Sequence, residues 1–166
     1  MTEQDAAAID PLVFRQVLGH FPTGVTVVTA APGGAPHGMT IGSFFSISLD
    51  PPLVGLCIDQ RSTSWPAIEP AGVFAVNILA EDQAAVSGHF ASKAESKFDG
   101  VDWRPGVSGS PILPGVVGHI DCRTEQVIDS GDHWIVVGRV LELAVDREAR
   151  PLLFFRGGYG TFTGVG

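Results

Sequence analysis

Hydroxyl side chains and glycines gather in one short segment, His37-Gly38-Met39-Thr40-Ile41-Gly42-Ser43-Phe44. Its two glycines have no Cβ and would let backbone amides come close to a flat ligand, while Thr40 and Ser43 offer hydroxyl groups for hydrogen bonds. A flat heteroaromatic ring needs such a slot, with donors along one edge. A glycine-rich strand with a bulge is also a common structural feature that binds nothing. The residues alone leave both interpretations open.

A second polar segment, residues 59–65 (DQRSTSW), follows an apolar run and opens an expected short helix. Free amides at the helix start, three hydroxyls and one arginine would suit a phosphate, although an ordinary helix cap needs only one of those hydroxyls. The two lysines of the chain, Lys93 and Lys97, both lie in the following segment 90–98. They could bring a cation to the same phosphate, and a solvated loop would explain them equally well.

The overall composition narrows the classes of partner. The 166 residues carry 10 basic and 18 acidic side chains, a net charge of −8, so the surface would repel the phosphates of nucleic acid. With 45% hydrophobic and only 17% charged residues, the chain is apolar for a soluble monomer. Burial of the excess apolar surface between two subunits would account for this, so we expect a homodimer. No apolar run approaches the ~20 residues of a membrane span, and the acidic start MTEQDAAAID is unlike a signal peptide. We therefore expect a cytoplasmic protein without a membrane partner.

Several common catalytic and binding motifs are missing from the sequence. There is no P-loop, no GxGxxG that follows a strand and opens a helix, no GxSxG elbow and no HExxH. The five histidines show no i, i+4 pairing, and Cys57 and Cys122 have no neighbours at metal-ligand spacing, so we expect no metal and two free thiols. Any dinucleotide would have to bind without a Rossmann phosphate turn.

Strands must position most of these residues. Asp10-Pro11 is typical of a helix start and Gly19 of its end. Alternating and β-branched runs predict strands at 24–29, 37–40, 43–48, 53–58, 73–79, 115–128, 133–145 and 152–155. Short helices are expected through Ile68 and over 81–87, a hairpin turn at 129–132, and irregular chain over 89–115, anchored by Phe98 and Trp103. This pattern is mainly β and suits a Greek-key barrel better than alternating strands and helices.

Nine sequence blocks, read in order, carry a family resemblance. They are PTGVTVVT, GMTIGSF, SLDPPLVGLCI, STSWPAI, FAVNIL, HFASKAESKFDGVDW, GSPIL, GDHWIVVGRV and PLLFFRGGYG. Together they resemble the short-chain flavin reductase family, the reductase components of two-component flavin-dependent monooxygenases. The resemblance runs from about Phe14 to Tyr159. It implies an FMN-binding split β-barrel with short flanking helices, homodimeric, with the flavin near the subunit interface, and a single domain over 1–166 whose core spans about 12–160.

The resemblance also implies roles for individual residues. His133 would lie near the nicotinamide, although a histidine beside an aspartate in a hairpin is usually only a polar turn residue. Arg156 would serve the NADH side or simply form an ion pair. Gly42 stands where many relatives carry asparagine. The residues implied for cofactor binding are Met39, Thr40, Ile41, Gly42, Ser43, Phe44, Ser62, Thr63, Ser64, Phe90, Ala91, Lys97, Phe98, Arg156 and Tyr159.

The activity implied by the resemblance is hydride transfer from NADH to FMN or FAD, with the reduced flavin passed to a separate oxygenase. NADPH is the alternative donor; the lack of an arginine cluster for its 2′-phosphate favours NADH. Such a reaction needs stacked rings rather than a catalytic triad. Two other interpretations stay open: a non-catalytic flavin- or heme-binding split-barrel protein, and a protein whose apolar surface only mediates assembly.

Overall fold

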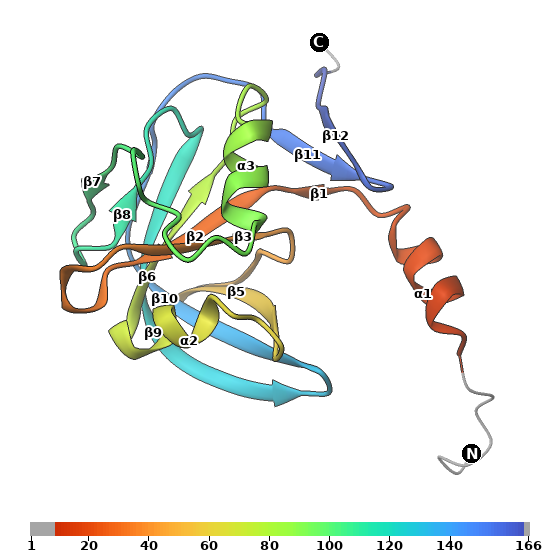
Figure 1. The fold of residues 1–166 in the computed structure, drawn as a ribbon, viewed down its shortest axis with the longest axis horizontal. Coiled ribbons are helices and arrows are strands. Elements are labelled where there is room, and N and C mark those ends of the chain that lie inside the picture. The colour runs from red at the N-terminus through yellow and green to blue at the C-terminus, as the bar shows by residue number, and fades with distance from the viewer. Residues whose placement is uncertain (1–8, 165–166) are drawn as a thin grey trace.

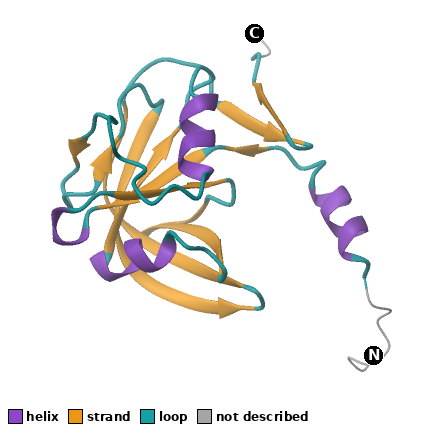
Figure 2. Cartoon of the chain, in the orientation of Figure 1, coloured by secondary structure: helices purple, strands orange, loops and turns teal. Residues whose placement is uncertain are grey.

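The computed structural model describes residues 9–164, so residues 1–8 and 165–166 of the predicted 1–166 domain lie outside the described residues (Figure 1). Strands dominate it, and the few helices are short and peripheral (Figure 2). The helices are α1 (Pro11–Leu18), α2 (Trp65–Ile68) and α3 (Ala84–Ala91), with single 3-10 turns at Pro32–Gly34 and Glu69–Ala71. The strands are β1 (Thr23–Gly24), β2 (Thr26–Ala30), β3 (His37–Ile41), β4 (Phe45–Leu49), β5 (Pro52–Asp59), β6 (Val73–Ile78), β7 (Arg104–Pro105), β8 (Pro111–Ile112), β9 (Gly118–Ser130), β10 (His133–Val145), β11 (Leu152–Phe155) and β12 (Gly158–Thr161). The predicted mainly β class is confirmed.

The main sheet is antiparallel and strongly curved. Its seven strands run in the order β3-β2-β6-β9-β10-β5-β4, so β3 and β4 occupy opposite edges although they are consecutive in the chain. Across a flat sheet these edges would be roughly 29 Å apart. The link from Ile41 to Phe45 reaches at most about 14 Å. The sheet must therefore curl until its edges approach, and β3 accordingly contacts β5, the neighbour of the far edge strand.

Two apolar clusters form the core on either side of this curved sheet. One contains Leu56, Trp65 and Phe74, each with at most 1% of its surface exposed, and includes the helix α2 that covers one end. The other lies beneath α3 and contains Leu79, Phe90 and Leu152. Each helix of the main body is thus held by one large aromatic side chain.

Sequence patterns located most elements, and the differences have local causes. Asp10 caps α1 as predicted, with its Oδ1 accepting from the Leu12 amide at 2.8 Å. The expected strand 24–29 is interrupted at Val25, whose backbone bonds instead to Leu79 and Leu152. The helix predicted over 81–87 is wrong in its bounds, because Gln83 Oε1 accepts from the Ala80 amide at 3.0 Å and holds residues 81–83 in a turn. The helix α3 starts only after that turn.

The N-terminal and C-terminal segments of the described chain meet in a small sheet beside the main body. Strands β1, β11 and β12 make a small three-stranded sheet, and α1 projects from it away from the main sheet (Figure 1). None of the residues of α1 is buried. Within residues 9–164, no helix has the length and apolarity needed to cross a membrane.

Candidate functional site

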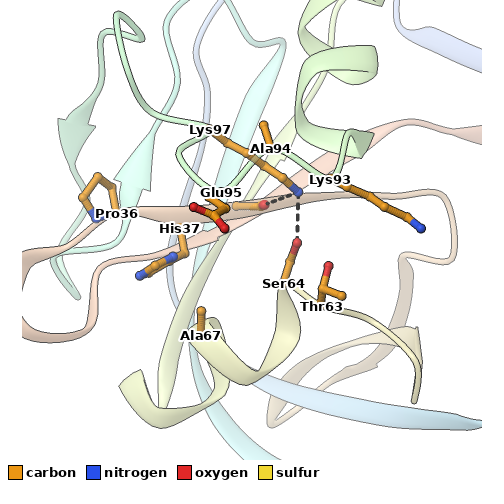
Figure 3. A pocket seen from close by; sticks show the side chains of 10 residues that line it. Pro36, His37, Thr63, Ser64, Ala67, Lys93, Ala94, Glu95 and Lys97 are labelled. Atoms are coloured by element: carbon orange, nitrogen blue, oxygen red, sulfur yellow. Dashed lines mark hydrogen bonds between the residues drawn. The ribbon is translucent and has the colours of Figure 1, made fainter.

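Two adjacent cavities meet at the side chain of Lys97. The first has a volume of about 270 Å³ and lies between the start of β3, α2 and the segment 93–97 (Figure 3). The second, about 290 Å³, continues along Met39 and Thr40 toward the end of α3. Thr63, Ser64, Lys93 and Lys97 line both. The two segments that sequence reasoning associated with a phosphate, 62–64 and 90–97, are therefore brought together.

Lys97 is a buried cation held by neutral groups. Its side chain crosses from the loop toward β3 and α2 (Figure 3), and only 8% of the residue is exposed. Its Nζ donates to the Phe90 carbonyl at 2.8 Å, to Ser64 Oγ at 2.9 Å and to the Gly38 carbonyl at 3.3 Å. Burial lowers the pKa of Lys97. Among residues 9–164, Lys97 makes no ion pair. Glu95 lines the first cavity but not the second, so an anion would meet this positive charge most favourably in the second cavity.

The three hydroxyls of residues 62–64 have different partners. Ser62 Oγ accepts from the amides of Ser64 and Trp65 at 3.3 and 3.2 Å, at the start of α2. Ser64 binds Lys97, whereas the hydroxyl of Thr63 has no hydrogen-bond partner within the described chain and lines both cavities. One hydroxyl of the segment thus serves the start of α2 and one binds the cation, while the phosphate-binding interpretation stays a prediction.

Arg61 also lines the second cavity, but its charge is already neutralised. Its guanidinium binds Asp59 through two contacts, Nη2–Oδ2 at 2.8 Å and Nε–Oδ1 at 3.1 Å, and 81% of its side chain is exposed. These hydrogen bonds hold the pKa of Asp59 well below its usual range. The arginine therefore offers a bound anion much less than Lys97 does.

The glycine- and hydroxyl-rich segment 37–44 is divided between cavities. Thr40 lies at the second cavity, and its Oγ1 donates to the Ser87 carbonyl at 2.7 Å. The side chain of Ile41 is buried in the core, and Ser43 Oγ is engaged with the backbone of Cys57, donating to its carbonyl at 2.8 Å and accepting from its amide at 3.0 Å. Gly42, Ser43 and Phe44 line a third cavity of about 440 Å³, together with residues 21–24 and Phe45.

Helix α3 supplies the opposite wall of the second cavity, through Phe90 and Ala91. The Phe90 ring lies so close to Gly38 that a Cβ at residue 38 would be 2.7 Å from it. Phe98 packs edge-to-face on Phe90, with ring centroids 5.1 Å apart, and Trp103 packs on Phe98 in turn. Phe98 thus supports the wall from behind, as the anchor that the sequence predicted.

The residues assigned to a nicotinamide lie apart from Lys97. His133 begins β10 opposite Asp59, with 42% of its side chain exposed and its Nδ1 2.7 Å from Asp132 Oδ1. This hydrogen bond lowers the pKa of Asp132. Arg156 is exposed in the β11–β12 turn with a positive φ of 49°. Neither residue lines the two cavities that meet at Lys97.

Sequence reasoning missed Ser87, and it singled out Gly38 without the contacts that the structure gives it. Gly38 provides a carbonyl to Lys97 and the space that Phe90 occupies. Ser87, fully buried in α3, is 2.9 Å from the hydroxyl of Tyr159 and accepts from Thr40 through its carbonyl. A serine on the inner face of a short apolar helix is the one signal that could have indicated Ser87, because a buried hydroxyl needs partners.

Comparison with known proteins gives this geometry a family. Residues 18–163 match the flavin reductase like domain. A flavin reductase from Pseudomonas putida is 54% identical over 160 residues, covering 96% of this chain and 94% of that protein. The monooxygenase reductase subunit HsaB of Rhodococcus jostii is 52% identical over 154 residues, covering 93% of this chain and 79% of that protein. The solved structure of the Streptomyces globisporus NADH:FAD oxidoreductase SgcE6, in complex with NAD and FAD fragments, superposes with a TM-score of 0.86 at 37% identity, over 95% of this chain and 98% of that one. The chain belongs to the flavin reductase like domain family.

Proposed function

We propose that this protein is an NADH-dependent flavin reductase that delivers reduced flavin to a separate oxygenase. The observation that carries the proposal is the buried Lys97, which is bound by neutral groups between two cavities on β3, in a chain that belongs to this family. NADH would supply the hydride and the flavin would accept it, so the protein has only to bind and orient the two. The names of the relatives, a monooxygenase reductase subunit and an NADH:FAD oxidoreductase, favour this over a non-catalytic carrier.

Lys97 would hold the flavin phosphate, assisted by the free hydroxyl of Thr63. A charge-assisted hydrogen bond to phosphate is stronger than the bonds to neutral acceptors that Lys97 makes now. We therefore expect the site to hold an anionic tail and to bind FMN and FAD more tightly than uncharged riboflavin.

The exposed edge of β3 would face the isoalloxazine ring. β3 pairs only with β2 in the sheet, and the Gly38 carbonyl points away from β2 toward Lys97. Because backbone groups of an antiparallel strand alternate in direction, the amide of Thr40 faces outward as well. The amides of β3 that face away from β2 would then donate hydrogen bonds to one edge of the isoalloxazine ring. His133 and Arg156 would bind the nicotinamide nucleotide from the hairpin tip and the C-terminal ribbon.

We further propose that the curved sheet is a split barrel, that 1–166 is a single domain, and that the protein acts as a homodimer. The apolar side chains of Leu12, Phe14 and Val17 on α1 are each more than half exposed, and Leu49 on β4 is 90% exposed. A second copy covering these surfaces would also bring α1 near the third cavity, whose wall includes Phe21. Light scattering should report a dimer; a monomer at micromolar concentration would contradict this part. We place the reaction in the cytoplasm, where NADH is produced.

The central test is an NADH oxidation assay run in parallel with riboflavin, FMN and FAD. Rapid loss of the NADH absorbance band with flavin present, and none without it, supports a reductase. Flavin that binds without NADH consumption would support a carrier instead, and absence of flavin binding would favour an assembly protein. Tighter binding of FMN and FAD than of riboflavin would show that the phosphate contributes to binding.

A further inference from the structure

A chain of hydrogen bonds joins the C-terminal ribbon, which is the hairpin of β11 and β12, to the second cavity, which is lined by Thr40, Phe90 and Lys97 and is called the flavin cavity below. The hydroxyl of Tyr159 on β12 lies 2.9 Å from Ser87 Oγ on α3, and the Ser87 carbonyl accepts from Thr40 Oγ1 on β3 at 2.7 Å. Tyr159 is 72 residues from Ser87, and Thr40 is 47 residues from it. Three segments distant in the sequence therefore meet at one fully buried serine.

Helix α3 and the loop after it form a single wall of the cavity. His89 Nε2 donates to the Lys97 carbonyl at 2.7 Å, while Lys97 Nζ donates back to the Phe90 carbonyl at 2.8 Å. These two hydrogen bonds connect α3 to the loop that follows it, so residues 84–97 are held as one unit. Because the same segment carries Phe90, Ala91 and Lys97, any shift of α3 displaces the aromatic wall and the cation together.

We propose that Tyr159 is a positioning residue for the flavin cavity. Acting through Ser87, its hydroxyl keeps α3 seated on Thr40, and so keeps Lys97 and Phe90 where a flavin needs them, without Tyr159 touching the flavin. The inference rests on the proposed function.

The tyrosine hydroxyl can be removed with little other change. The Tyr159 ring is about half exposed and packs against Phe154, with ring centroids 5.6 Å apart, and phenylalanine preserves this contact. In Tyr159→Phe the buried Ser87 hydroxyl loses its partner, and a buried polar group without one favours a shifted helix. Thr161→Val is the matched control, since it removes a hydroxyl from the same strand, one that bonds the Pro151 carbonyl at 3.3 Å.

The experiment measures FMN dissociation constants by fluorescence quenching, without NADH, for wild type, Tyr159→Phe and Thr161→Val. We expect roughly a 3- to 10-fold weaker affinity in Tyr159→Phe, unchanged affinity in Thr161→Val, and similar melting temperatures. Adding Ser87→Ala to Tyr159→Phe should weaken binding no further, because both remove the same hydrogen bond.

Each outcome has a definite meaning. Equal affinities for wild type and Tyr159→Phe would overturn the positioning role while leaving the reductase proposal intact. An equal loss in Thr161→Val would reduce Tyr159 to a general structural residue. A wild-type protein that does not bind FMN at all would instead refute the proposed function itself.

Discussion

Two cationic regions of the molecule differ in what holds their charge. Near the β9–β10 turn, Arg61, which also lines the second cavity, is exposed and bound to Asp59, and His133 Nδ1 lies 2.7 Å from Asp132 Oδ1. At the cavity, Lys97 is buried and surrounded by two carbonyls and one hydroxyl. Because the chain has 18 acidic and only 10 basic side chains, a basic side chain is expected to form an ion pair with a nearby carboxylate. Lys97 makes no ion pair within residues 9–164, although Glu95 lines the first cavity. The proposed anion site therefore rests on burial among neutral acceptors and not on the presence of charge alone.

The largest effect should come from Lys97→Met, which keeps the length of the side chain and removes its charge. A charge-assisted hydrogen bond contributes about 1.5–3 kcal/mol, so FMN affinity should fall roughly 10- to 100-fold, while riboflavin affinity changes little. Fluorescence titration with the two flavins measures the difference. Arg61→Gln removes the paired cation at the same cavity and should cost FMN binding much less. Equal losses in the two variants would erase the distinction between the regions.

The pH dependence of FMN affinity and of stability should also distinguish Lys97 from the region around Asp59 and Asp132. Burial lowers the pKa of Lys97, and a bound phosphate favours its charged form. FMN affinity should therefore be full below that lowered pKa and fall as the pH rises through it, at a pH below the ordinary lysine value of about 10.4. The stability of the ligand-free protein should move the opposite way, because the buried charge is relieved as Lys97 loses its proton.

Lys97→Met provides the control for this titration, since its FMN affinity should lose that alkaline step. The region around Asp59 and Asp132 should respond at acid pH instead. The folded-state pKa values of Asp59 and Asp132 are depressed, so their contribution to stability is present above the ordinary aspartate range and is lost as the pH falls. An alkaline step that persists in Lys97→Met would assign it to another group.

Gly38→Ala tests how closely the Phe90 ring of α3 packs against β3 beside the second cavity. The new Cβ would lie 2.7 Å from the Phe90 ring, so the α3 wall must move, at a cost of about 1–3 kcal/mol in the free energy of unfolding. FMN affinity should drop several-fold with it. Gly72→Ala is the control: Gly72 has a positive φ of 64° and open space around it, so the variant is strained but leaves the cavity alone. Denaturation and FMN titration of both variants separate stability from binding.

The smallest effect belongs to the exposed region. His133→Ala should raise the KM for NADH roughly 5-fold, the cost of about one hydrogen bond, and leave the FMN dissociation constant nearly unchanged. Steady-state kinetics and flavin titration together give the split. If the KM does not change, His133 is a turn residue and no more.

Local patterns predicted those parts of the fold that depend on neighbours in sequence. The bounds of β10 at His133 and Val145 agree with the prediction, because β-branched alternation and the glycine turn before it are both local signals. The two-residue strands β7 and β8, with their prolines, and the glycine-rich β12 gave no such signal and were missed. The start of α3 depends on the side chain of Gln83, which no periodicity describes.

The candidate site divides in the same way. The clustering of hydroxyls at 62–64 and of lysines at 93–97 was visible in the sequence, and the structure brings the two together. Which hydroxyl faces which partner was not visible, because Ser43 meets Cys57 and Ser87 meets Tyr159 only after long-range folding. The sequence therefore indicated which residues belong to the candidate site. Which of them bind other parts of the protein and which face the cavities could be seen only from the tertiary contacts.

Helix α1 has only eight residues, and none of them is buried. Isolated helices shorter than about 12–15 residues are marginal in water, so α1 depends on whatever surface lies against it. If that surface is a second copy, dilution below the dimer dissociation constant should melt α1 before it affects the sheet. Hydrogen exchange of the amides of Phe14 to Leu18 would then report association directly, with no flavin and no turnover required.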